Sequence, residues 1–390
     1  MKVLVISQRK LLPMTDGALI GSMGLLNYLH DLGHTIQVIH FIEDKDYSRE
    51  ELLQLNEIVD KVHVVKLFWR STALNISFRY PNSIRKYKRA IFEKKVMQVK
   101  KDFEPDFAVI DHTQMYEYSK CFKDMYYVLH THNVESNVWF SYAQNKRGLV
   151  KCLVNRTAKM MRDYEINALR ESPSVTACSE TDTTFFKGLV PSANVATFHS
   201  YLKFPIVKTL QDIKKLNKTI IFIGSYSWYP NQISARFLIN EVMPILRKRL
   251  FGVKLILVGK SPTEEMMKDA KRYDDITVTG MVDSVDPYIK TADVFVNAIE
   301  DGGGINIKLI ETMGKGIPVV TSKFGSRGIN IRDGYNALIY SNTDECVEKI
   351  MCFMNNKDLA IKCSINARLE YELFIQPNEQ VKNMFCPNEV

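Results

Sequence analysis

The sequence lacks an apolar run that approaches the roughly 20 residues a membrane-spanning helix needs. Residues 1–13 hold only a short apolar run, interrupted by Arg9 and Lys10, which is typical of a first strand and not of a signal peptide. The seven cysteines are scattered, odd in number and without a Cys-x-x-Cys pair. We therefore expect a reduced, cytoplasmic protein without a structural zinc site.

The chain is long and unevenly charged. Its 390 residues exceed one ordinary domain, and its 46% hydrophobic content supports globular cores. The net charge of +8 is concentrated in two stretches, 79–102 and 145–163, where Lys and Arg alternate with apolar residues. Each stretch alone is explained by a solvated helix face. Because two of them occur in one half of the chain, we expect a peripheral contact with the anionic inner face of a membrane and no nucleic acid.

Strands and helices alternate along both halves of the chain. Val3 to Ser7 reads as a first strand, a helix follows Gly17, and the next strand ends near His40. The glycines of this unit form no Gly-x-Gly-x-x-Gly fingerprint, so no dinucleotide site is indicated. The alternation restarts at Thr219. The fold class predicted is α/β, with two doubly wound, Rossmann-like domains. Their expected bounds are 1–200 and 219–375, with a linker at 201–218 and a tail at 376–390 that could cross back to the first domain.

The stretch 294–322 predicts a strand, a glycine loop, a helix and a strand. The glycines 302–304 let a ligand approach the N–H groups at the start of the helix. Lys308 and Glu311 are three residues apart and share one helix face. A cation beside free N–H groups suits a diphosphate, and a carboxylate one turn later suits sugar hydroxyls, so the pair suits a nucleotide. The alternative is an ordinary i,i+3 ion pair on the surface.

Polar residues also follow a strand of the first half. His130, His132, Asn133 and Glu135 gather at its carboxyl end. Two histidines could bind zinc, but no third ligand is evident, so we expect a polar substrate cluster and no metal. Gly17, at the carboxyl end of the first strand, is a second place for substrate contacts.

Three motifs occur in the order found in one known family. The segment 224-GSYSWYPN-231 resembles the opening of the C-terminal domain in bacterial family-4-type glycosyltransferases, also called glycosyl transferases group 1. The segment 304-GINIKLIETMGKGIPVV-320 is similar to their Gly-x-x-x-Lys-x-x-Glu element, and 132-HNVESNVW-139 resembles their His-Asn-x-Glu segment. The resemblance implies a GT-B fold, in which two Rossmann-like domains face a central cleft.

The resemblance also implies roles for single residues. Glu311 would bind the ribose of a nucleotide-sugar, and His132 would lie near the transferred sugar. Together with Lys308, these are the implied catalytic residues. The other implied donor contacts are Gly17, Gly224, Ser225, Trp228, Lys260, Gly280, Met281, Val282, Gly304, Ile305, Asn306 and Ile307. The family works without a metal or a cofactor beyond the nucleotide-sugar, and most family-4 enzymes retain the anomeric configuration.

The sequence departs from the family pattern at two places. Many relatives carry a Glu-x7-Glu pair, but Gly303 stands eight residues before Glu311. Tyr226 and Trp228 replace the Arg and Lys found after the first strand of the C-terminal domain in many relatives, and Lys260 is a candidate substitute, although a surface lysine explains it equally well.

Two functions follow as hypotheses. The first is transfer of a sugar from a UDP- or GDP-sugar to a glycan or lipid-linked acceptor, in bacterial surface polysaccharide or glycoconjugate synthesis. The alternative is a catalytically silent GT-B subunit that binds glycan or a partner enzyme. Gly303 favours the silent subunit, whereas Lys308 and Glu311 favour the enzyme. A GT-B-fold epimerase needs more acids and histidines around the site than the sequence places there.

Overall fold

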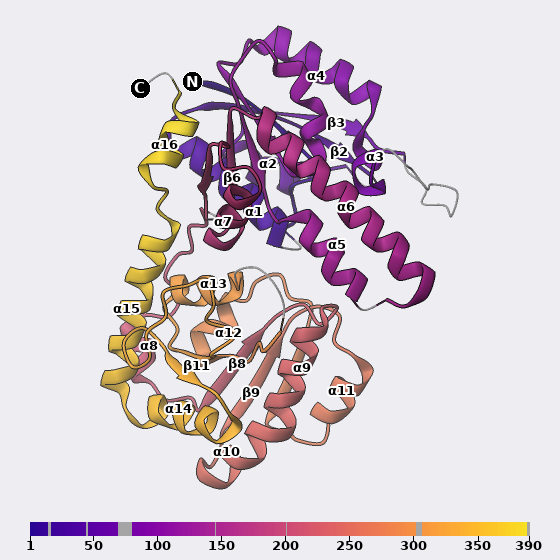
Figure 1. Ribbon diagram of the computed structural model, residues 1–390. Helices are drawn as coiled ribbons and strands as arrows, with labels where there is room; N and C mark the ends of the chain where they lie inside the picture. Colours follow the sequence, from indigo (N-terminus) through magenta and orange to yellow (C-terminus); the bar gives the residue numbers. More distant parts are fainter. Residues whose placement is uncertain are drawn as a thin grey trace. The chain divides into compact units, whose positions relative to one another are not determined.

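The computed structural model describes residues 1–14, 17–43, 46–68, 80–144, 146–199, 201–301 and 306–387. These residues form two compact units (Figure 1). The N-terminal unit runs from Met1 to Leu202 and includes the end of the chain from Gln376, and the C-terminal unit runs from Lys203 to Ile375. In these described ranges no helix combines the length and apolar character needed to cross a bilayer.

A seven-stranded parallel sheet is the centre of the N-terminal unit, in the order β3-β2-β1-β4-β5-β6-β7. β1 pairs with β2 on one side and with β4 on the other, so the order of the strands reverses at β1. In doubly wound sheets, ligands bind at the carboxyl ends of the strands beside such a reversal. The strands are β1 (Lys2–Ser7), β2 (Thr35–Ile42), β3 (Lys61–Lys66), β4 (Phe107–Asp111), β5 (Tyr127–Thr131), β6 (Ser174–Ala177) and β7 (Val195–Thr197).

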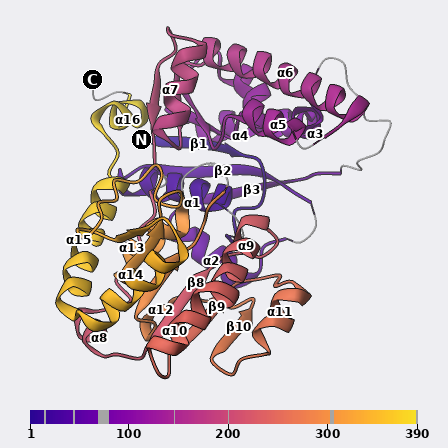
Figure 2. The same ribbon diagram turned by 60° about the horizontal axis from the view of Figure 1, so that its bottom comes forward.

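Helices cover both faces of this sheet (Figure 2). Alternate residues of β1 supply the two cores, because successive side chains of a strand point to opposite faces. Leu4 and Ile6 pack with side chains of α4, α6 and α7, whereas Val3 and Val5 pack with side chains of α1 and α16. The helices are α1 (Gly17–Asp31), α2 (Arg49–Asn56), α3 (Asn82–Tyr87), α4 (Ala90–Phe103), η1 (Thr113–Phe122), α5 (Glu135–Gln144), α6 (Gly148–Glu171), α7 (Glu180–Leu189) and α16 (Glu379–Phe385).

The C-terminal unit has a six-stranded parallel sheet in the order β10-β9-β8-β11-β12-β13. One hydrophobic core joins the sheet to its helices. The strands are β8 (Thr219–Ile223), β9 (Lys254–Val258), β10 (Ile276–Gly280), β11 (Val294–Asn297), β12 (Val319–Ser322) and β13 (Leu338–Tyr340). The helices are α8 (Leu210–Lys214), α9 (Tyr229–Phe237), η2 (Leu238–Val242), α10 (Met243–Arg249), α11 (Glu264–Ala270), α12 (Asp286–Thr291), α13 (Ile307–Lys315), α14 (Thr343–Asn355) and α15 (Lys357–Ile375). The prediction of two Rossmann-like, doubly wound domains is confirmed.

Much of the segment expected as a linker packs against the C-terminal unit. The backbone N–H groups of Val207 and Lys208 donate to the carbonyl oxygen of Lys315, at 3.0 and 2.9 Å. Lys208 is buried, and its ammonium donates to the carbonyl oxygen of Lys290 at 3.2 Å. Thr209 then caps α8. The polar composition that suggested a linker therefore reflects capping and a hydrogen-bonded lysine.

The end of the chain packs into the N-terminal unit through α16. Val381 and Phe385 are fully buried in the core under α1. The Phe385 ring lies 5.8 Å from Tyr28 and 5.7 Å from Phe198, both edge-on, and the Phe385 carbonyl oxygen accepts a hydrogen bond from His34 Nε2 at 2.8 Å. The last helix is therefore a structural part of the first unit.

We expect Phe385→Ala to lower the free energy of unfolding of the N-terminal unit by about 3–5 kcal/mol, because it leaves a cavity among packed aromatic rings. Hydrogen exchange of the β1 and β4 amides measures this unit alone. Phe251→Ala is the control, since that side chain is almost fully exposed in the C-terminal unit. Equal protection of these amides in both variants contradicts a structural role for α16.

Candidate active site

Lys308 lies in the first turn of α13, directly after the loop at the carboxyl end of β11. Its Nζ donates to Asn231 Oδ1 at 2.6 Å. It also lies 5.4 Å from the centre of the Trp228 ring and 5.6 Å from that of Phe222. Among the described residues, no carboxylate bonds this ammonium. The ion pair with Glu311, considered as the alternative to a nucleotide site, is therefore not formed, and the cation is held by an amide and two aromatic rings.

Asn231 is the residue that places Lys308. It is buried, and its Nδ2 donates to the carbonyl oxygen of Ser225 at 2.7 Å. Gly224 makes room for it, because a Cβ there would lie 2.7 Å from Asn231 Nδ2. Gly259 is required in turn: its φ is +149°, and a Cβ would lie 1.8 Å from the Gly224 carbonyl oxygen. The two glycines thus act through backbone packing on the side chain that holds the lysine.

Burial lowers the pKa of Lys308 to about 8, although the Glu311 carboxylate opposes the shift. Removing an ammonium from water disfavours its charged form. Since the lysine is still largely protonated at neutral pH, the free protein holds a partly desolvated cation without a bonded anion. Such a group favours a ligand that brings negative charge.

Glu311 forms an ion pair with Lys315 and not with Lys308. Its Oε1 accepts from Lys315 Nζ at 2.6 Å, one turn further along α13. Lys315 also bonds Asp286 Oδ1 at 2.6 Å, so two carboxylates surround it. Glu311 Oε2 has no partner among the residues that the structure describes and can accept from ligand hydroxyls. Sequence reasoning missed Lys315 and Asp286, although a lysine four residues after a glutamate is a recognised helix pair.

A buried amide anchors the start of α13. Asn297, at the end of β11, is fully buried, and its Oδ1 accepts from Asn306 Nδ2 at 2.8 Å. Its Nδ2 donates to Thr321 Oγ1 and to the Gly325 carbonyl oxygen, both at 3.1 Å. Asn306 directly precedes Ile307, so this amide fixes where the helix and its free N–H groups begin. Gly304 and Ile305, two further predicted donor residues, lie outside the described residues, as does Gly303.

The remaining predicted donor residues occupy neighbouring loops of the same sheet edge. The N–H of Tyr226 donates to the Lys260 carbonyl oxygen at 2.9 Å, and the N–H of Gly259 donates to that of Gly280 at 3.2 Å. The loops after β8, β9 and β10 are therefore hydrogen-bonded in series. Ser225 bonds Ser227 through their hydroxyls at 2.7 Å. In the last of these loops Met281 is exposed, while Val282 packs partly against the core.

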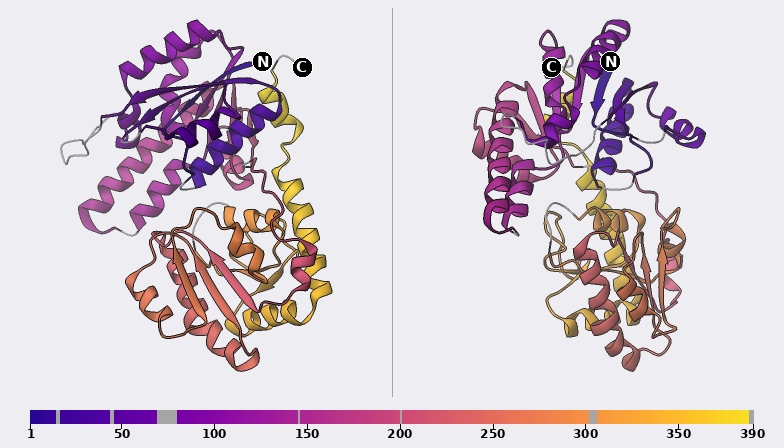
Figure 3. Two further views of the ribbon diagram at one scale, coloured as in Figure 1. Left: turned by 180° about the vertical axis from the view of Figure 1, so that it is seen from behind. Right: turned by 90° about the vertical axis from the view of Figure 1, so that its right-hand side faces the viewer.

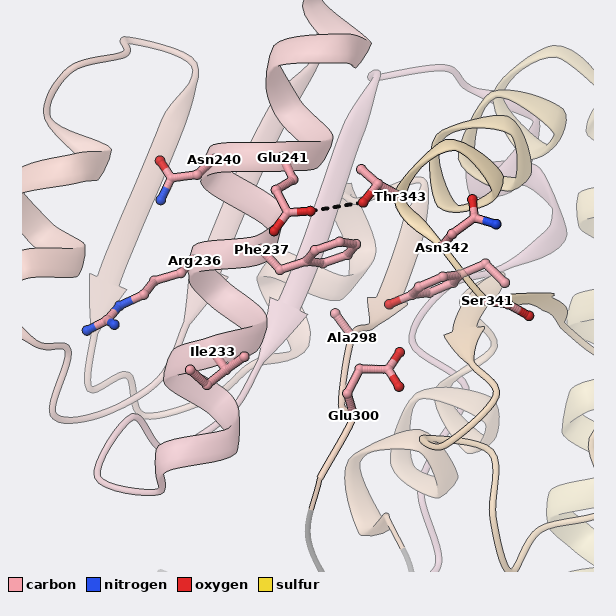
Figure 4. A pocket seen from close by; sticks show the side chains of 11 residues that line it. Ile233, Arg236, Phe237, Asn240, Glu241, Ala298, Glu300, Ser341, Asn342 and Thr343 are labelled. Atoms are coloured by element: carbon pink, nitrogen blue, oxygen red, sulfur yellow. Dashed lines mark hydrogen bonds between the residues drawn. The ribbon is translucent and has the colours of Figure 1, made fainter.

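A cavity of about 460 Å³ lies in the C-terminal unit between α9, η2 and the start of α14 (Figure 4). Glu300, two residues before the glycines, lines it, and burial raises the pKa of this carboxyl group. On the opposite wall Thr343 Oγ1 donates to Glu241 Oε2 at 2.9 Å. The hydroxyl of Tyr340 is buried there and bonds none of the residues that the structure describes. Glu300 is thus an acid on the wall of a cavity, which sequence reasoning noted only as out of register.

Asp111 is the centre of the polar cluster in the N-terminal unit. It ends β4 and is 1% exposed. Its Oδ2 accepts from Ser7 Oγ at 2.7 Å and from Ser22 Oγ at 2.6 Å, and its Oδ1 lies 2.6 Å from His132 Nε2. Burial by itself raises the pKa of Asp111, but the adjacent His112 and His132 outweigh it and hold that pKa well below its usual range. Asp111 is therefore an anionic anchor for three elements.

His132 is oriented by Asp111. Because an ionised carboxylate only accepts, the ring donates Nε2–H to it and keeps Nδ1 as an acceptor. Burial, together with the charge of His112, lowers the pKa of His132, so the imidazole is neutral at neutral pH. Asn133 and Glu135 follow His132 closely in the sequence, but the carboxylate that holds its ring is Asp111. Sequence reasoning missed Asp111. An acid at the carboxyl end of a buried strand was the signal that could have indicated its role.

The other histidines of this cluster have different roles. His130 is fully buried, and its Nδ1 forms a hydrogen bond of 2.9 Å with Thr176 Oγ1. Its ring packs edge-on against Phe198, so His130 is a core residue. His112 has a positive φ of 82° and lies 4.0 Å from His132, ring centre to ring centre. A bulky side chain in that backbone region is strained, and such strain often occurs at functional sites.

Gly17 is the first residue of α1, and Ser22 of the same helix reaches Asp111. The start of α1 therefore belongs to the same end of the sheet as the Asp111 cluster. The helix entrance at 15–16 lies outside the described residues. The structure thus supports the position expected for Gly17 without assigning it a ligand.

Within the ranges that the structure describes, two sets of side chains could hold a metal ion. They are His130, His132 and Cys178, and Asp111, His112 and His132. The statement that no third ligand is evident is therefore wrong for the folded chain. Both sets use His132, whose ring already bonds Asp111, and Ser7 and Ser22 already donate to the same carboxylate. These bonds occupy both oxygens of the Asp111 carboxylate, and function without a metal stays our prediction.

Residues 217–356 match the family model described as Glycosyl transferases group 1. The C-terminal unit is a group 1 glycosyltransferase domain on a GT-B fold. The structure of Anabaena HepE in complex with UDP and glucose superposes with a TM-score of 0.66 at 16% identity, and the match covers 100% of this chain and 98% of that one. Lys308 and Glu311 lie in the matched domain, whereas Asp111 and His132 precede it.

Two curated relatives match over shorter segments. An uncharacterised 44.6 kDa protein of the cps region of Klebsiella pneumoniae is 23% identical over 177 residues, 43% of this chain and 44% of its own. Phosphatidyl-myo-inositol mannosyltransferase of Mycobacterium leprae is 28% identical over 123 residues, 31% of this chain and 32% of its own. The chain thus matches less than half the length of each.

We expect Lys308 to titrate near pH 8, well below the ordinary lysine value, because burial disfavours its ammonium. The measurement is NMR of the isotope-labelled lysine side chains across pH 6–11, with Lys308→Arg to assign the signal. Lys315 is the internal comparison, since its two carboxylate partners raise its pKa. Titration of Lys308 with the bulk of the lysines contradicts its burial.

Proposed function

We propose that the protein moves a sugar from a UDP- or GDP-sugar to a glycan or lipid-linked acceptor, in bacterial surface polysaccharide or glycoconjugate synthesis. The observation that carries the proposal is Lys308, a half-buried cation at the start of α13 without a bonded carboxylate. A nucleoside diphosphate supplies the missing charge. Free N–H groups of the same helix end favour the same ligand.

The relatives support this substrate class. HepE is described in complex with UDP and glucose, the two parts of a nucleotide-sugar. A lipid acceptor is favoured by the name of the mannosyltransferase, and a capsular or surface polysaccharide by the cps region of the Klebsiella protein. These names describe those proteins, and for this chain they support the sugar-transfer proposal over other nucleotide chemistry.

In the proposed complex, the diphosphate bonds Lys308 and the N–H groups of Asn306 and Ile307. Glu311 Oε2 accepts from the ribose hydroxyls, while Lys315 keeps the carboxylate in place through Oε1. The base lies against the backbone of Gly280 to Val282, in the hydrogen-bonded loops of that sheet edge. Charge that develops on the departing diphosphate is stabilised by the cation and the helix end, without a metal.

His132 acts on the sugar in this proposal. Its Nδ1 is an acceptor, fixed in direction by the bond from Nε2–H to Asp111, and hydrogen-bonds a hydroxyl at the reacting sugar. Asp111 is a positioning residue, since it acts through the imidazole. We infer retention of anomeric configuration, as in most family-4-type enzymes, and a place at the cytoplasmic face of a membrane.

The silent-subunit alternative rests on Gly303, where many relatives have the first acid of a pair. A protein of that kind binds a nucleotide or glycan but releases no nucleoside diphosphate from any donor. Release of UDP or GDP from a panel of nucleotide-sugars with membrane extract as acceptor therefore separates the two functions. Absence of release with intact nucleotide binding rejects the enzyme.

We expect Lys308→Ala and Glu311→Ala each to weaken UDP or GDP binding by about 10- to 150-fold, because each removes a charge-assisted hydrogen bond. Calorimetry with the free diphosphate measures the affinity. Lys268→Ala, an exposed lysine of α11, is the matched control and should bind as the unchanged protein does. Unchanged affinity in both test variants removes the donor site proposed here.

We expect His132→Ala and Asp111→Asn to cut turnover by about a hundredfold or more with little change in diphosphate affinity. Asn donates where Asp accepts, so the substitution favours the tautomer with Nε2 as acceptor and Nδ1 protonated. His30→Ala, on an exposed turn of α1, is the control. Full activity of either test variant shows that the pair is structural.

A further inference from the structure

The part of the helical hairpin α5–α6 next to its turn carries charge of one sign only. Residues 136–162, which cover most of α5, the turn and most of α6, contain no Asp or Glu. Among the described residues, Lys146, Arg147, Lys151 and Lys159 form no ion pair. The cations in this range are Lys146, Arg147, Lys151, Arg156, Lys159 and Arg162.

Large apolar side chains are exposed between these cations. Leu149, in the first turn of α6, is 85% exposed, and Leu153 lies one turn further on the same side of the helix. On α5, Val138 and Tyr142 are likewise four residues apart and exposed, and Lys146 Nζ lies 4.5 Å from the Tyr142 ring centre. The two helices lie side by side (Figures 1 and 3). The apolar groups therefore gather at the turn of the hairpin.

The other basic stretch, 79–102, is built differently. Lys86 pairs with Glu43, and Lys88 pairs with Glu117. Most of its apolar residues, among them Phe92, are core residues, whereas Ile91 and Met97 are exposed. Carboxylates of other elements thus pair with part of its charge, and its apolar face packs on the sheet, as in an ordinary amphipathic helix. The structure thus distinguishes two stretches that the sequence presented as equivalent.

We propose that the α5–α6 turn inserts into the surface of an anionic lipid bilayer, with Leu149 and Leu153 among the acyl chains and the surrounding cations at the headgroups. A bilayer is the occupant that accepts both exposed aliphatic side chains and uncompensated positive charge. A nucleic acid offers no apolar surface for the exposed leucines. A second copy of the chain would bring the same charges into repulsion. The proposal concerns binding and is independent of the donor site.

The test compares the whole protein with Leu149→Ser/Leu153→Ser, which keeps every charge, and with Lys146→Gln/Arg147→Gln/Lys151→Gln, which keeps every apolar side chain. Binding is measured by sedimentation with vesicles of phosphatidylglycerol and phosphatidylcholine in equal parts, and with phosphatidylcholine alone. We expect the serine variant to bind at least about tenfold more weakly. We expect about a fivefold loss for each cation removed, and weak binding to the neutral vesicles.

Leu149→Trp adds a measurement of insertion. Its fluorescence should shift to the blue and be quenched by lipids brominated in their acyl chains. Phe251→Ser, which removes an exposed apolar side chain from the C-terminal unit, is the control and should bind as the unchanged protein does. Equal vesicle binding by the serine variant and the unchanged protein overturns the proposal, as does binding without quenching. Calorimetric UDP binding by the same variants should be unchanged, so a failure here is separate from a failure of the donor site.

Discussion

The parallel sheet, covered by helices on both faces, is the constraint on which both units depend. Its strands bury their side chains and pair their backbone groups within the sheet, so polar chemistry is confined to the loops at the strand ends. In each unit, a buried polar residue at the carboxyl end of a central strand connects the neighbouring loops. In the N-terminal unit it is Asp111, and in the C-terminal unit it is Asn297. The side chain of each residue forms hydrogen bonds with loops or helices that the strand pairing does not connect.

The two lysines of α13 show how surroundings decide what a cation does. Lys315 lies between the carboxylates of Glu311 and Asp286, which raise its pKa despite burial, so it is a structural charge. Lys308, two turns earlier, bonds the neutral amide of Asn231 and has a lowered pKa. A buried cation is costly unless it is paired, so the Lys308 environment is electrostatically incomplete in the free protein. Ligand charge completes it.

The two basic stretches of the surface also differ in what their cations contact. In 79–102 the carboxylates of other elements pair with Lys86, Lys88 and Lys100, and the helix uses its apolar face for the core. In 136–162 no acid is present, and apolar side chains face outward at the hairpin turn. Net charge per stretch does not separate these cases, because it omits the partners that folding brings to each side chain.

The sequence by itself determined the alternation of strands and helices, the placement of Lys308 and Glu311 on one helix after a glycine loop, and the gathering of His130 and His132 at a strand end. Each depends on spacing within about 20 residues, where periodicity and turn residues are informative. Only the tertiary structure decided that Asn231 holds Lys308 across 77 positions and that Asp111 orients His132 across 21. It also decided that α16 returns to the first core. Hydrogen-bond partners and burial are set by which loops meet at a sheet edge, and no local pattern records which distant residue arrives there.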